Sequence, residues 1–204
     1  MSYGVGVLAS GEGTNLQAIL DRVHGRDGIE VVAVGSDKPQ ARALERGREA
    51  GVATEVCARE DFPDRASRDV SMAAWLAEQH TDLVVLAGYM QMVSTEFLER
   101  FPDRVVNVHP ALLPAFPGLK AIDQAVDYGV KVFGVTVHFV DEGVDTGAII
   151  AQRAVELPGA TDPAVVREAL RPLEHELLSA VVLACARGDV TRADPGGRRV
   201  RARL

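Results

Sequence analysis

The sequence of 204 residues predicts an α/β fold, a doubly wound and mostly parallel sheet with helices on both faces, followed by a C-terminal strand pair and a long helix. Short apolar runs alternate with stretches of helical spacing through the first half of the chain. These runs are apolar throughout, as is typical of parallel strands that are covered on both faces. After Gly129 the pattern changes to two longer strand-like stretches and one long helical stretch.

Strand and helix patterns alternate from the start of the chain. Residues 5–9 form an apolar run that predicts a strand, and this run ends at a glycine loop of residues 10–14. Residues 15–23 have helical spacing, residues 29–34 are apolar and β-branched, and residues 40–50 again have helical spacing. This order predicts βαβ units and therefore parallel strands.

The alternation continues up to a proline-rich loop. We expect a short strand at 54–57, a helix at 65–79, an uninterrupted buried strand at 82–87 and a further strand at 105–108. Ligands of open parallel sheets bind beyond the carboxyl ends of the strands. The loops that follow the first, fourth and fifth of the expected strands are therefore the expected ligand sites.

The second half of the chain has a different pattern. Residues 131–140 and 148–155 are strand-like, and residues 141–147 between them indicate an antiparallel excursion or an extension of the sheet. Asp162 followed by Pro163 suits the N-cap and the first turn of a helix. A strand pair followed by a long helix is therefore expected here.

That helix is expected to be long and to have a basic segment after it. Its apolar periodicity runs to about residue 187, and Pro172 should kink or restart it. Residues 189–204 carry five arginines against two aspartates and few apolar side chains. We therefore expect one domain over residues 1–188 and a basic, flexible tail over 189–204.

Composition narrows the classes of partner. The chain is 47% hydrophobic and 25% charged, which is ordinary for a globular protein with a core. Its net charge of −7 argues against broad nucleic-acid binding, which needs basic patches that displace counterions. A small anionic ligand stays compatible with this charge, because a few backbone amides can hold it locally.

The sequence also bears on the compartment. No apolar stretch approaches the roughly 20 residues that span a bilayer, so we expect no membrane association. A strand-like segment begins almost at once with no basic stretch before it, so we expect no signal peptide. Cys57 and Cys185 lie far apart with no paired spacing, which favours a reducing cytoplasm and two small buried side chains.

The glycine loop has two interpretations. Residues 10–15 have the sequence Ser-Gly-Glu-Gly-Thr-Asn and lead into a predicted helix, whose N-terminal amides could hold a phosphate. The loop is not a dinucleotide fingerprint, because Leu16 stands where the third glycine would be, and it lacks the lysine of a P-loop. From the residues alone, phosphate binding and a tight turn are equally favoured.

The strongest chemical signal is an amide, an imidazole and a carboxylate. Asn107 and His109 stand two residues apart at a strand end, so their side chains can point the same way. The prolines that follow stiffen the loop, and Asp145 comes later in a glycine-rich turn. Such a set can perform acyl transfer without a covalent enzyme intermediate. The alternative is a structural histidine and an aspartate that serves only its turn.

The sequence offers two other chemistries, both less favoured. His109, His138, Asp141 and Asp145 could supply nitrogen and oxygen ligands to a metal, but no recognised metal spacing such as H-E-x-x-H is present. We therefore expect no metal. A serine nucleophile is not favoured either, because the sequence contains no G-x-S-x-G elbow.

Four segments together give the chain a specific resemblance. They are Ala-Ser-Gly-Glu-Gly-Thr-Asn-Leu-Gln-Ala-Ile at 9–19, Leu-Ala-Gly-Tyr-Met at 86–90, Val-Asn-Val-His-Pro-Ala-Leu-Leu-Pro-Ala-Phe-Pro-Gly at 106–118, and Gly-Val-Thr-Val-His-Phe-Val-Asp-Glu-Gly-Val-Asp-Thr-Gly at 134–147. In this order they resemble the folate-dependent glycinamide ribonucleotide formyltransferases of purine synthesis. The resemblance extends over about residues 5–187 and implies the formyltransferase fold.

The resemblance implies an activity and the residues that perform it. A formyl group would pass from the co-substrate 10-formyltetrahydrofolate to the amine of glycinamide ribonucleotide, with no metal. The catalytic residues would be Asn107, His109 and Asp145. The residues that bind the nucleotide would be Gly13, Thr14, Asn15, Pro110 and Glu174. The residues that bind folate would be Arg65, Met90, Gln91, Met92, Val93, Asn107, Asp141, Glu142, Gly143, Val144 and Asp145.

The chain departs from the family pattern in several places. Gln91 stands where an arginine is common, which puts one folate contact in doubt. Arg171 stands where a glutamine is frequent and Pro172 follows it, which puts the geometry before Glu174 in doubt. Some family members also have histidines at the two positions that are Lys120 and Ile122 here.

Related activities fit the sequence less well. A formyltetrahydrofolate deformylase would carry an N-terminal regulatory domain, and a methionyl-tRNA formyltransferase would carry a C-terminal RNA-binding domain. A non-enzymatic sensor would tolerate loss of the histidine or the aspartate, and both are present. We therefore expect an enzyme with small-molecule substrates, no nucleic-acid or membrane partner, and a monomeric or homodimeric state.

Overall fold

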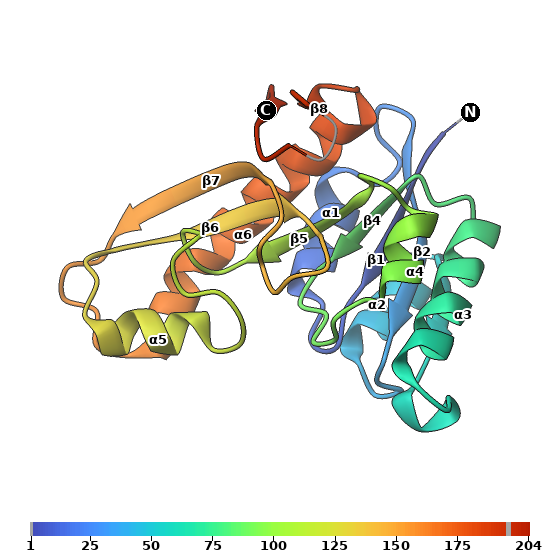
Figure 1. Cartoon of the computed structure of the whole chain (residues 1–204), viewed down its shortest axis with the longest axis horizontal. Coiled ribbons are helices and arrows are strands. Elements are labelled where there is room, and N and C mark those ends of the chain that lie inside the picture. Colours follow the sequence, from blue (N-terminus) through green and yellow to red (C-terminus); the bar gives the residue numbers. More distant parts are fainter. Residues whose placement is uncertain (1, 195–196) are drawn as a thin grey trace. The chain divides into compact units, whose positions relative to one another are not determined.

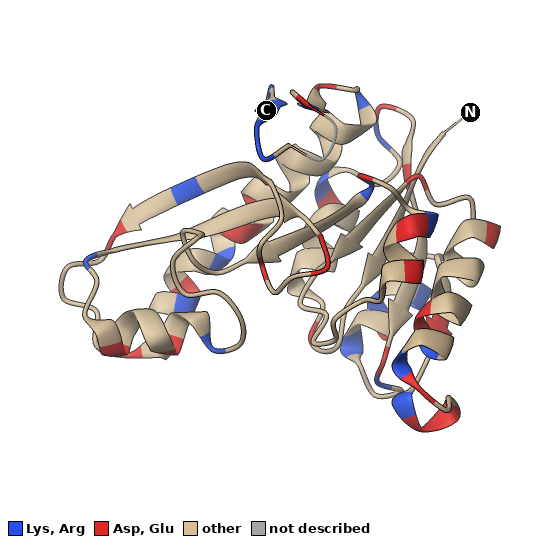
Figure 2. Cartoon of the chain, viewed as in Figure 1, with Lys and Arg blue, Asp and Glu red and all other residues tan. Residues whose placement is uncertain are grey.

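The computed structural model describes residues 2–194 and 197–204 and divides into two compact units. The first unit is Met1–Asn107 and the second is Val108–Leu204. The expected single domain over residues 1–188 stays a prediction. In both units, most Lys, Arg, Asp and Glu residues lie on helices and loops, and few lie on strands (Figure 2).

The first unit is built on a parallel sheet (Figure 1). Its strand order is β3-β2-β1-β4-β5, and every neighbouring pair is parallel. Because β1 lies between strands that come later on either side, the chain winds outward in two directions from it. The strands are β1 (Tyr3–Leu8), β2 (Ile29–Ser36), β3 (Ala53–Val56), β4 (Leu83–Leu86) and β5 (Val105–His109).

Helices cover both faces of this sheet, as the sequence predicts. A Cβ on Gly35 of β2 would lie 2.9 Å from the sulfur of Met72, whereas a Cβ on Gly47 would lie 3.1 Å from Val34, the preceding residue of β2. Met72 lies on α3 and Gly47 on α2. Consecutive strand residues face opposite sides, so α2 and α3 cover opposite faces. The helices are α1 (Thr14–Arg22), α2 (Arg42–Glu49), α3 (Arg65–Glu78) and α4 (Thr95–Arg100), with a short 3-10 turn η1 (Arg59–Asp61).

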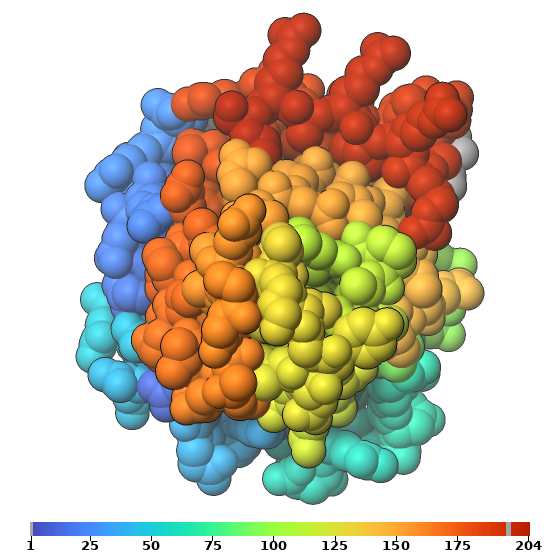
Figure 3. Space-filling view, turned by 90° about the vertical axis from the view of Figure 1, so that its left-hand side faces the viewer, coloured from blue at the N-terminus to red at the C-terminus, as the bar shows by residue number. Residues whose placement is uncertain are grey.

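The second unit contains the predicted strand pair and long helix. Strands β6 (Val132–Phe139) and β7 (Ile149–Glu156) are antiparallel, and α6 (Pro163–Ala186) packs against both. α6 buries Leu170, Leu177 and Val181. Helix α5 (Ala121–Tyr128), yellow in Figure 3, also contacts α6.

The start of α6 agrees with the predicted N-cap and first turn, but its interior does not show the expected break at Pro172. Asp162 is the N-cap, its carboxylate accepts from the amide of Ala164 at 2.8 Å, and Pro163 occupies the first turn. The expected restart at Pro172 does not occur, since α6 continues through it. Pro172 is on the exposed side of α6, where water can satisfy the carbonyl that the missing N–H leaves free.

Short elements account for the remaining differences. Helices α4 and α5 were not predicted, because six and eight residues give too little periodicity to recognise. Within the expected tail, β8 (Val190–Arg192) and β9 (Val200–Ala202) form an antiparallel pair. Flexibility of residues 189–204 stays a prediction. Among the described residues, no helix has both the length and the apolar character to cross a membrane.

Candidate active site

Three chain segments leave the sheet of the first unit at the same level. Leu8, the last residue of β1, pairs with Leu86, the last residue of β4, and Leu86 pairs with Asn107 of β5. The loops after β1 and β4 therefore begin in the same row across the sheet, at the carboxyl ends of the strands. This is the point where the winding direction reverses, and the half-buried Asn107 lies in the same row.

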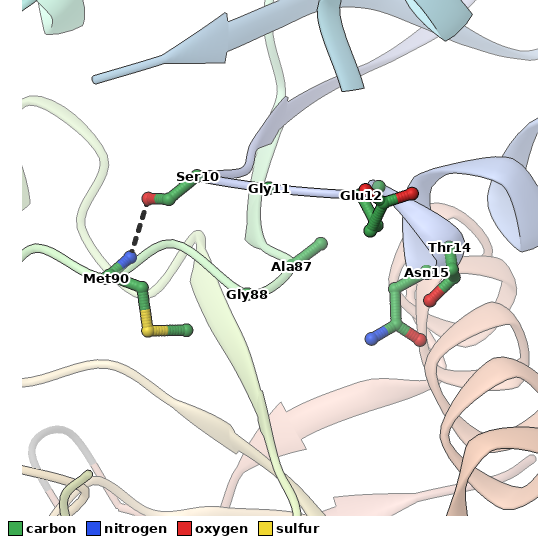
Figure 4. A pocket seen from close by; sticks show the side chains of 9 residues that line it. Ser10, Gly11, Glu12, Thr14, Asn15, Ala87, Gly88 and Met90 are labelled. Carbon is green, nitrogen blue, oxygen red and sulfur yellow. Dashed lines mark hydrogen bonds between the residues drawn. The ribbon is translucent and has the colours of Figure 1, made fainter. Parts of the chain in front are cut away.

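The loops after β1 and β4 line a pocket of about 250 Å³. Figure 4 shows them side by side, joined by the hydrogen bond from the Met90 amide to Ser10 Oγ at 2.8 Å. Helix α1 begins at Thr14, so the amides of its first turn are at this pocket. The lining residues are Ser10, Gly11, Glu12, Gly13, Thr14, Asn15, Ala87, Gly88 and Met90. The structure thus brings together the three predicted phosphate residues.

Helix α2 donates hydrogen bonds to the backbone of the glycine loop. Arg46 Nε donates to the carbonyl of Glu12 at 2.8 Å, and the amide of Ala43 donates to the carbonyl of Gly11 at 3.1 Å. Arg42 Nη1 lies 3.4 Å from a carboxylate oxygen of Glu12 and offsets its charge beside the pocket. With two carbonyls held by α2, the conformation of the loop does not depend on a ligand.

Gly13 is the position at which this loop tolerates no side chain. Its φ is +68°, and a Cβ would lie 2.8 Å from the Cα of Ala43. We expect Gly13→Ala to lower the free energy of unfolding by about 2 kcal/mol, because both the left-handed backbone and the contact with α2 resist it. It should also weaken the binding of a phosphorylated ligand. Urea unfolding and a titration with inorganic phosphate measure the two effects.

Gly11→Ala is the matched control for Gly13→Ala. Gly11 belongs to the same loop, its φ is not in the left-handed region, and a Cβ there would meet nothing within 4 Å. We expect its free energy of unfolding to stay within about 0.5 kcal/mol of the unaltered protein. Equal losses for the two variants would contradict the structural argument for Gly13.

The second unit brings His109 and Asp145 together. His109 Nδ1 lies 3.3 Å from Asp145 Oδ2, and its Nε2 lies 2.8 Å from the carbonyl of Phe116. Both groups accept hydrogen bonds, so each ring nitrogen of the buried His109 faces an acceptor. The same Asp145 Oδ2 accepts from the Gly118 amide at 2.7 Å. The carboxylate therefore holds both His109 and the loop that follows it.

A second histidine shares this carboxylate. His138 Nε2 lies 3.5 Å from Asp145 Oδ1, and its Nδ1 lies 2.7 Å from the carbonyl of Phe139. The sequence suggested His138 only as a metal ligand, and no sequence signal identified it as a partner of Asp145. Asp145 thus has one oxygen beside each imidazole.

The surroundings of Asp145 keep it ionised. Burial by itself raises the pKa of this carboxyl group. The hydrogen bond with His138, the hydrogen bond from the Gly118 amide and the charge of the two histidines outweigh burial, so the pKa of Asp145 lies below its usual value. Asp145 is thus suited to hold an imidazolium next to it.

The loop that carries His109 is fixed by β6 and β7. Thr136 Oγ1 donates to the carbonyl of Ala111 at 2.7 Å and accepts from the amide of Leu113 at 3.1 Å. Gln152 Nε2 donates to the carbonyl of Leu113 at 2.9 Å. The proline-rich loop is therefore held by the buried Thr136 and the half-buried Gln152 as well as by its own prolines.

The metal alternative is not favoured by the geometry. Asp141 Oδ1 accepts from Thr146 Oγ1 at 2.6 Å and from the Gly143 amide at 3.1 Å, so this carboxylate stabilises its own turn. Across the part of the chain that the structure describes, no group of three or more His, Cys, Asp or Glu side chains is arranged to hold a metal ion. His109, His138 and Asp145 meet as hydrogen-bonding partners.

The remaining predicted ligand residues lie in both units. In the first unit, Arg65 is exposed at the start of α3, and Met90, Gln91, Met92 and Val93 follow β4. In the second, Pro110 follows β5, Glu174 is on α6, and the turn between β6 and β7 carries the exposed Asp141, Glu142, Gly143 and Val144. Their roles in binding stay predictions.

Comparisons with known proteins agree on one family. Residues 4–182 match the family model described as formyl transferase. A phosphoribosylglycinamide formyltransferase of Mycobacterium tuberculosis is 44% identical over 197 residues, which are 95% of this chain and 91% of that protein. A crystal structure of glycinamide ribonucleotide transformylase 1 from Symbiobacterium toebii is similar with a TM-score of 0.94 at 44% identity, covering 98% of this chain and 94% of that one.

More distant relatives include parts of larger proteins. The trifunctional purine biosynthetic protein adenosine-3 of Homo sapiens is 36% identical over 193 residues, which are 94% of this chain but 19% of that protein. The predicted family and fold class are thus confirmed.

Proposed function

We propose a function from one premise, that this chain belongs to the formyl transferase family. The proposed reaction transfers the formyl group of 10-formyltetrahydrofolate to the amino group of glycinamide ribonucleotide. The product is N-formylglycinamide ribonucleotide, an intermediate of de novo purine biosynthesis. The observation that carries this proposal is the contact between His109 and Asp145. Asp145 is also held by the Gly118 amide and by His138.

The glycine loop is the proposed site of the ribonucleotide phosphate. The pocket there lies at the N-terminus of α1, where free amides favour an anion. Gly13, Thr14 and Asn15 would bind the phosphate and ribose, and Pro110 and Glu174 would contribute contacts to the same substrate. A phosphoribosyl substrate is supported by relatives from Mycobacterium tuberculosis and Bacillus subtilis, which are phosphoribosylglycinamide formyltransferases.

In the proposed chemistry the substrate amine attacks the formyl carbon directly. A new C–N bond forms, and the carbonyl oxygen becomes an oxyanion in the tetrahedral intermediate. The side-chain amide of Asn107 and the imidazolium of His109 would donate to this oxygen. When the bond between carbon and folate nitrogen breaks, His109 donates a proton to that nitrogen, and the attacking amine returns a proton to His109, so the imidazolium is regenerated. Asp145 would orient His109 and stabilise its charged form.

The folate co-substrate would be held by residues of both units. These are Arg65 and Met90, Gln91, Met92 and Val93 in the first unit, with Asn107, and Asp141, Glu142, Gly143, Val144 and Asp145 in the second. Met90 and Met92 are 56% and 44% exposed, which leaves apolar surface for a pterin ring. Direct transfer needs no metal and no covalent enzyme intermediate.

An assay with two products tests the proposal. The protein is incubated with glycinamide ribonucleotide and 10-formyltetrahydrofolate, and formylated nucleotide and free formate are both measured. We expect the nucleotide product to form at least about tenfold faster than formate, because the proposed site is arranged for an amine acceptor. Formate in excess, with or without the nucleotide, would instead identify a hydrolase that deformylates the cofactor.

The proposal includes the setting of the reaction. We place the enzyme in the cytoplasm, consistent with the free thiols of Cys57 and Cys185. Burial raises the pKa of Cys57 to about 11 and that of Cys185 to about 12, so both thiols stay protonated. We propose small-molecule substrates alone as partners, without nucleic acid or membrane, and a monomeric or homodimeric state.

A further inference from the structure

The side chain of Gln91 bonds to two buried charged groups of the first unit. Its Nε2 donates to Asp37 Oδ2 at 2.9 Å, and its Oε1 accepts from Arg68 Nη1 at 3.3 Å. Asp37 and Arg68 are 7% and 1% exposed, so both charges are buried. The amide of Gln91 therefore connects a buried carboxylate to a buried guanidinium.

Asp37 and Arg68 each make a further contact that leads back to residues 90–94. Ser10 Oγ donates to Asp37 Oδ1 and accepts from the amide of Met90. On the other side Arg68 pairs with Asp69 at 2.7 Å, and Asp69 Oδ2 accepts from the amide of Ser94 at 2.8 Å. Residues 90–94 are thus attached at three places: the Met90 amide, the Gln91 side chain and the Ser94 amide.

A neutral amide matches both Asp37 and Arg68. It offers a donor to the carboxylate and an acceptor to the guanidinium, and it adds no charge. A glutamate at position 91 would place a carboxylate against Asp37, and an arginine there would face Arg68. An apolar side chain would leave two buried charges without this partner, which is costly in a low-dielectric interior.

We infer that Gln91 is a positioning residue for the proposed folate segment, residues 90–93. This inference rests on the proposed function. The Gln91 side chain fixes the backbone of the segment relative to Ser10, which lines the nucleotide pocket. Because the Gln91 side chain is engaged with Asp37 and Arg68, position 91 would contribute its backbone to the proposed folate site. Asp37 and Ser10 complete the attachment.

A reciprocal exchange of charge tests the inference. In Gln91→Glu, two carboxylates meet, and we expect faster amide hydrogen exchange at residues 88–94 and an approximately tenfold weaker affinity for tetrahydrofolate, measured by calorimetry. In Asp37→Asn, two amide groups meet as donors, and a smaller loss in the same direction is expected. The Michaelis constant for the ribonucleotide should change less than about twofold in both variants.

The double variant Asp37→Asn with Gln91→Glu should restore both properties. Ser10 then donates to the carbonyl of the new amide at position 37, and the NH₂ group of that amide donates to the new carboxylate at position 91. Arg68 pairs with the same carboxylate, so every hydrogen bond is retained with the charge moved. Rescue by a second substitution is not expected of a residue that merely fills space. If Gln91→Glu does not fold, rescue of Asp37→Asn by the added Gln91→Glu decides the same question.

Two results would overturn the inference. One is unchanged hydrogen exchange and tetrahydrofolate affinity in Gln91→Glu, and the other is a double variant no better than either single variant. Gln79→Glu, the same change at the half-exposed C-cap of α3, is the control and should alter neither property. If the unaltered protein binds no tetrahydrofolate, the proposed function fails, whereas the exchange data at residues 88–94 still decide the positioning role.

Discussion

His109→Ala is expected to reduce the rate of formyl transfer about 10³-fold while the protein stays folded and still binds the ribonucleotide. General acid catalysis by a positioned imidazole contributes about 10²–10⁴-fold, and an oxyanion donor a similar factor. Both contributions would be lost at once, and they are not additive because one group supplies them. Single-turnover kinetics at saturating substrates measure the chemical step directly.

The fold should survive this substitution for a structural reason. Asp145 loses one partner, but it keeps His138 on its other oxygen and the Gly118 amide. The ribonucleotide affinity, measured by calorimetry, should therefore change less than about threefold, since the glycine loop proposed to bind its phosphate is unaltered. His24→Gln, at a histidine outside the site that accepts from the Val31 amide, is the control. A His109→Ala protein with more than a tenth of the original rate would contradict the proposed mechanism.

Much of the fold follows from short-range sequence signals. The central strands β1 and β4 lack charged residues and are mostly buried, because both faces of the sheet are covered, and Gly35 and Gly47 show how closely the helices approach. The start of α6 is equally predictable from the sequence, since the N-cap Asp162 and Pro163 both lie within its first turn. α4 and α5 were missed because a helix of two turns has no resolvable period.

The site was predictable where its residues are neighbours in sequence, and also at Asp145, which the family resemblance assigned to His109 across 36 residues. Asn107 and His109 share one strand end, so their spacing carried the signal. The contact between Asp37 and Gln91 joins residues 54 positions apart, and no local pattern predicts it. His138 is similar: an imidazole on a strand gives no indication of which carboxylate it will meet. Such pairs depend on strand order and loop conformation, which become visible only in the folded chain.

Asp145→Asn is expected to lower the rate of formyl transfer about 10²-fold with a small effect on structure. Asparagine suits the backbone, because the φ of Asp145 is +52° and asparagine tolerates this left-handed conformation better than alanine does. Its carbonyl can still accept from the Gly118 amide. What it loses is the negative charge beside His109, on which the stabilisation of an imidazolium depends. The single-turnover rate at neutral pH measures this loss.

The same variant has a pH signature in stability. The pKa of Asp145 in the folded protein lies below the value of 3.8 for a free carboxyl group, so ionised Asp145 stabilises the fold above that pH. This stabilisation is lost as the pH falls through the lower folded pKa, because protonation then occurs in both states. The advantage of the unaltered protein over Asp145→Asn in free energy of unfolding should thus be present at about pH 6 and shrink below about pH 4, as measured by urea unfolding. An advantage that grows in acid would mean that the carboxylate is not stabilised by its neighbours, and would remove the electrostatic reason for pairing Asp145 with His109.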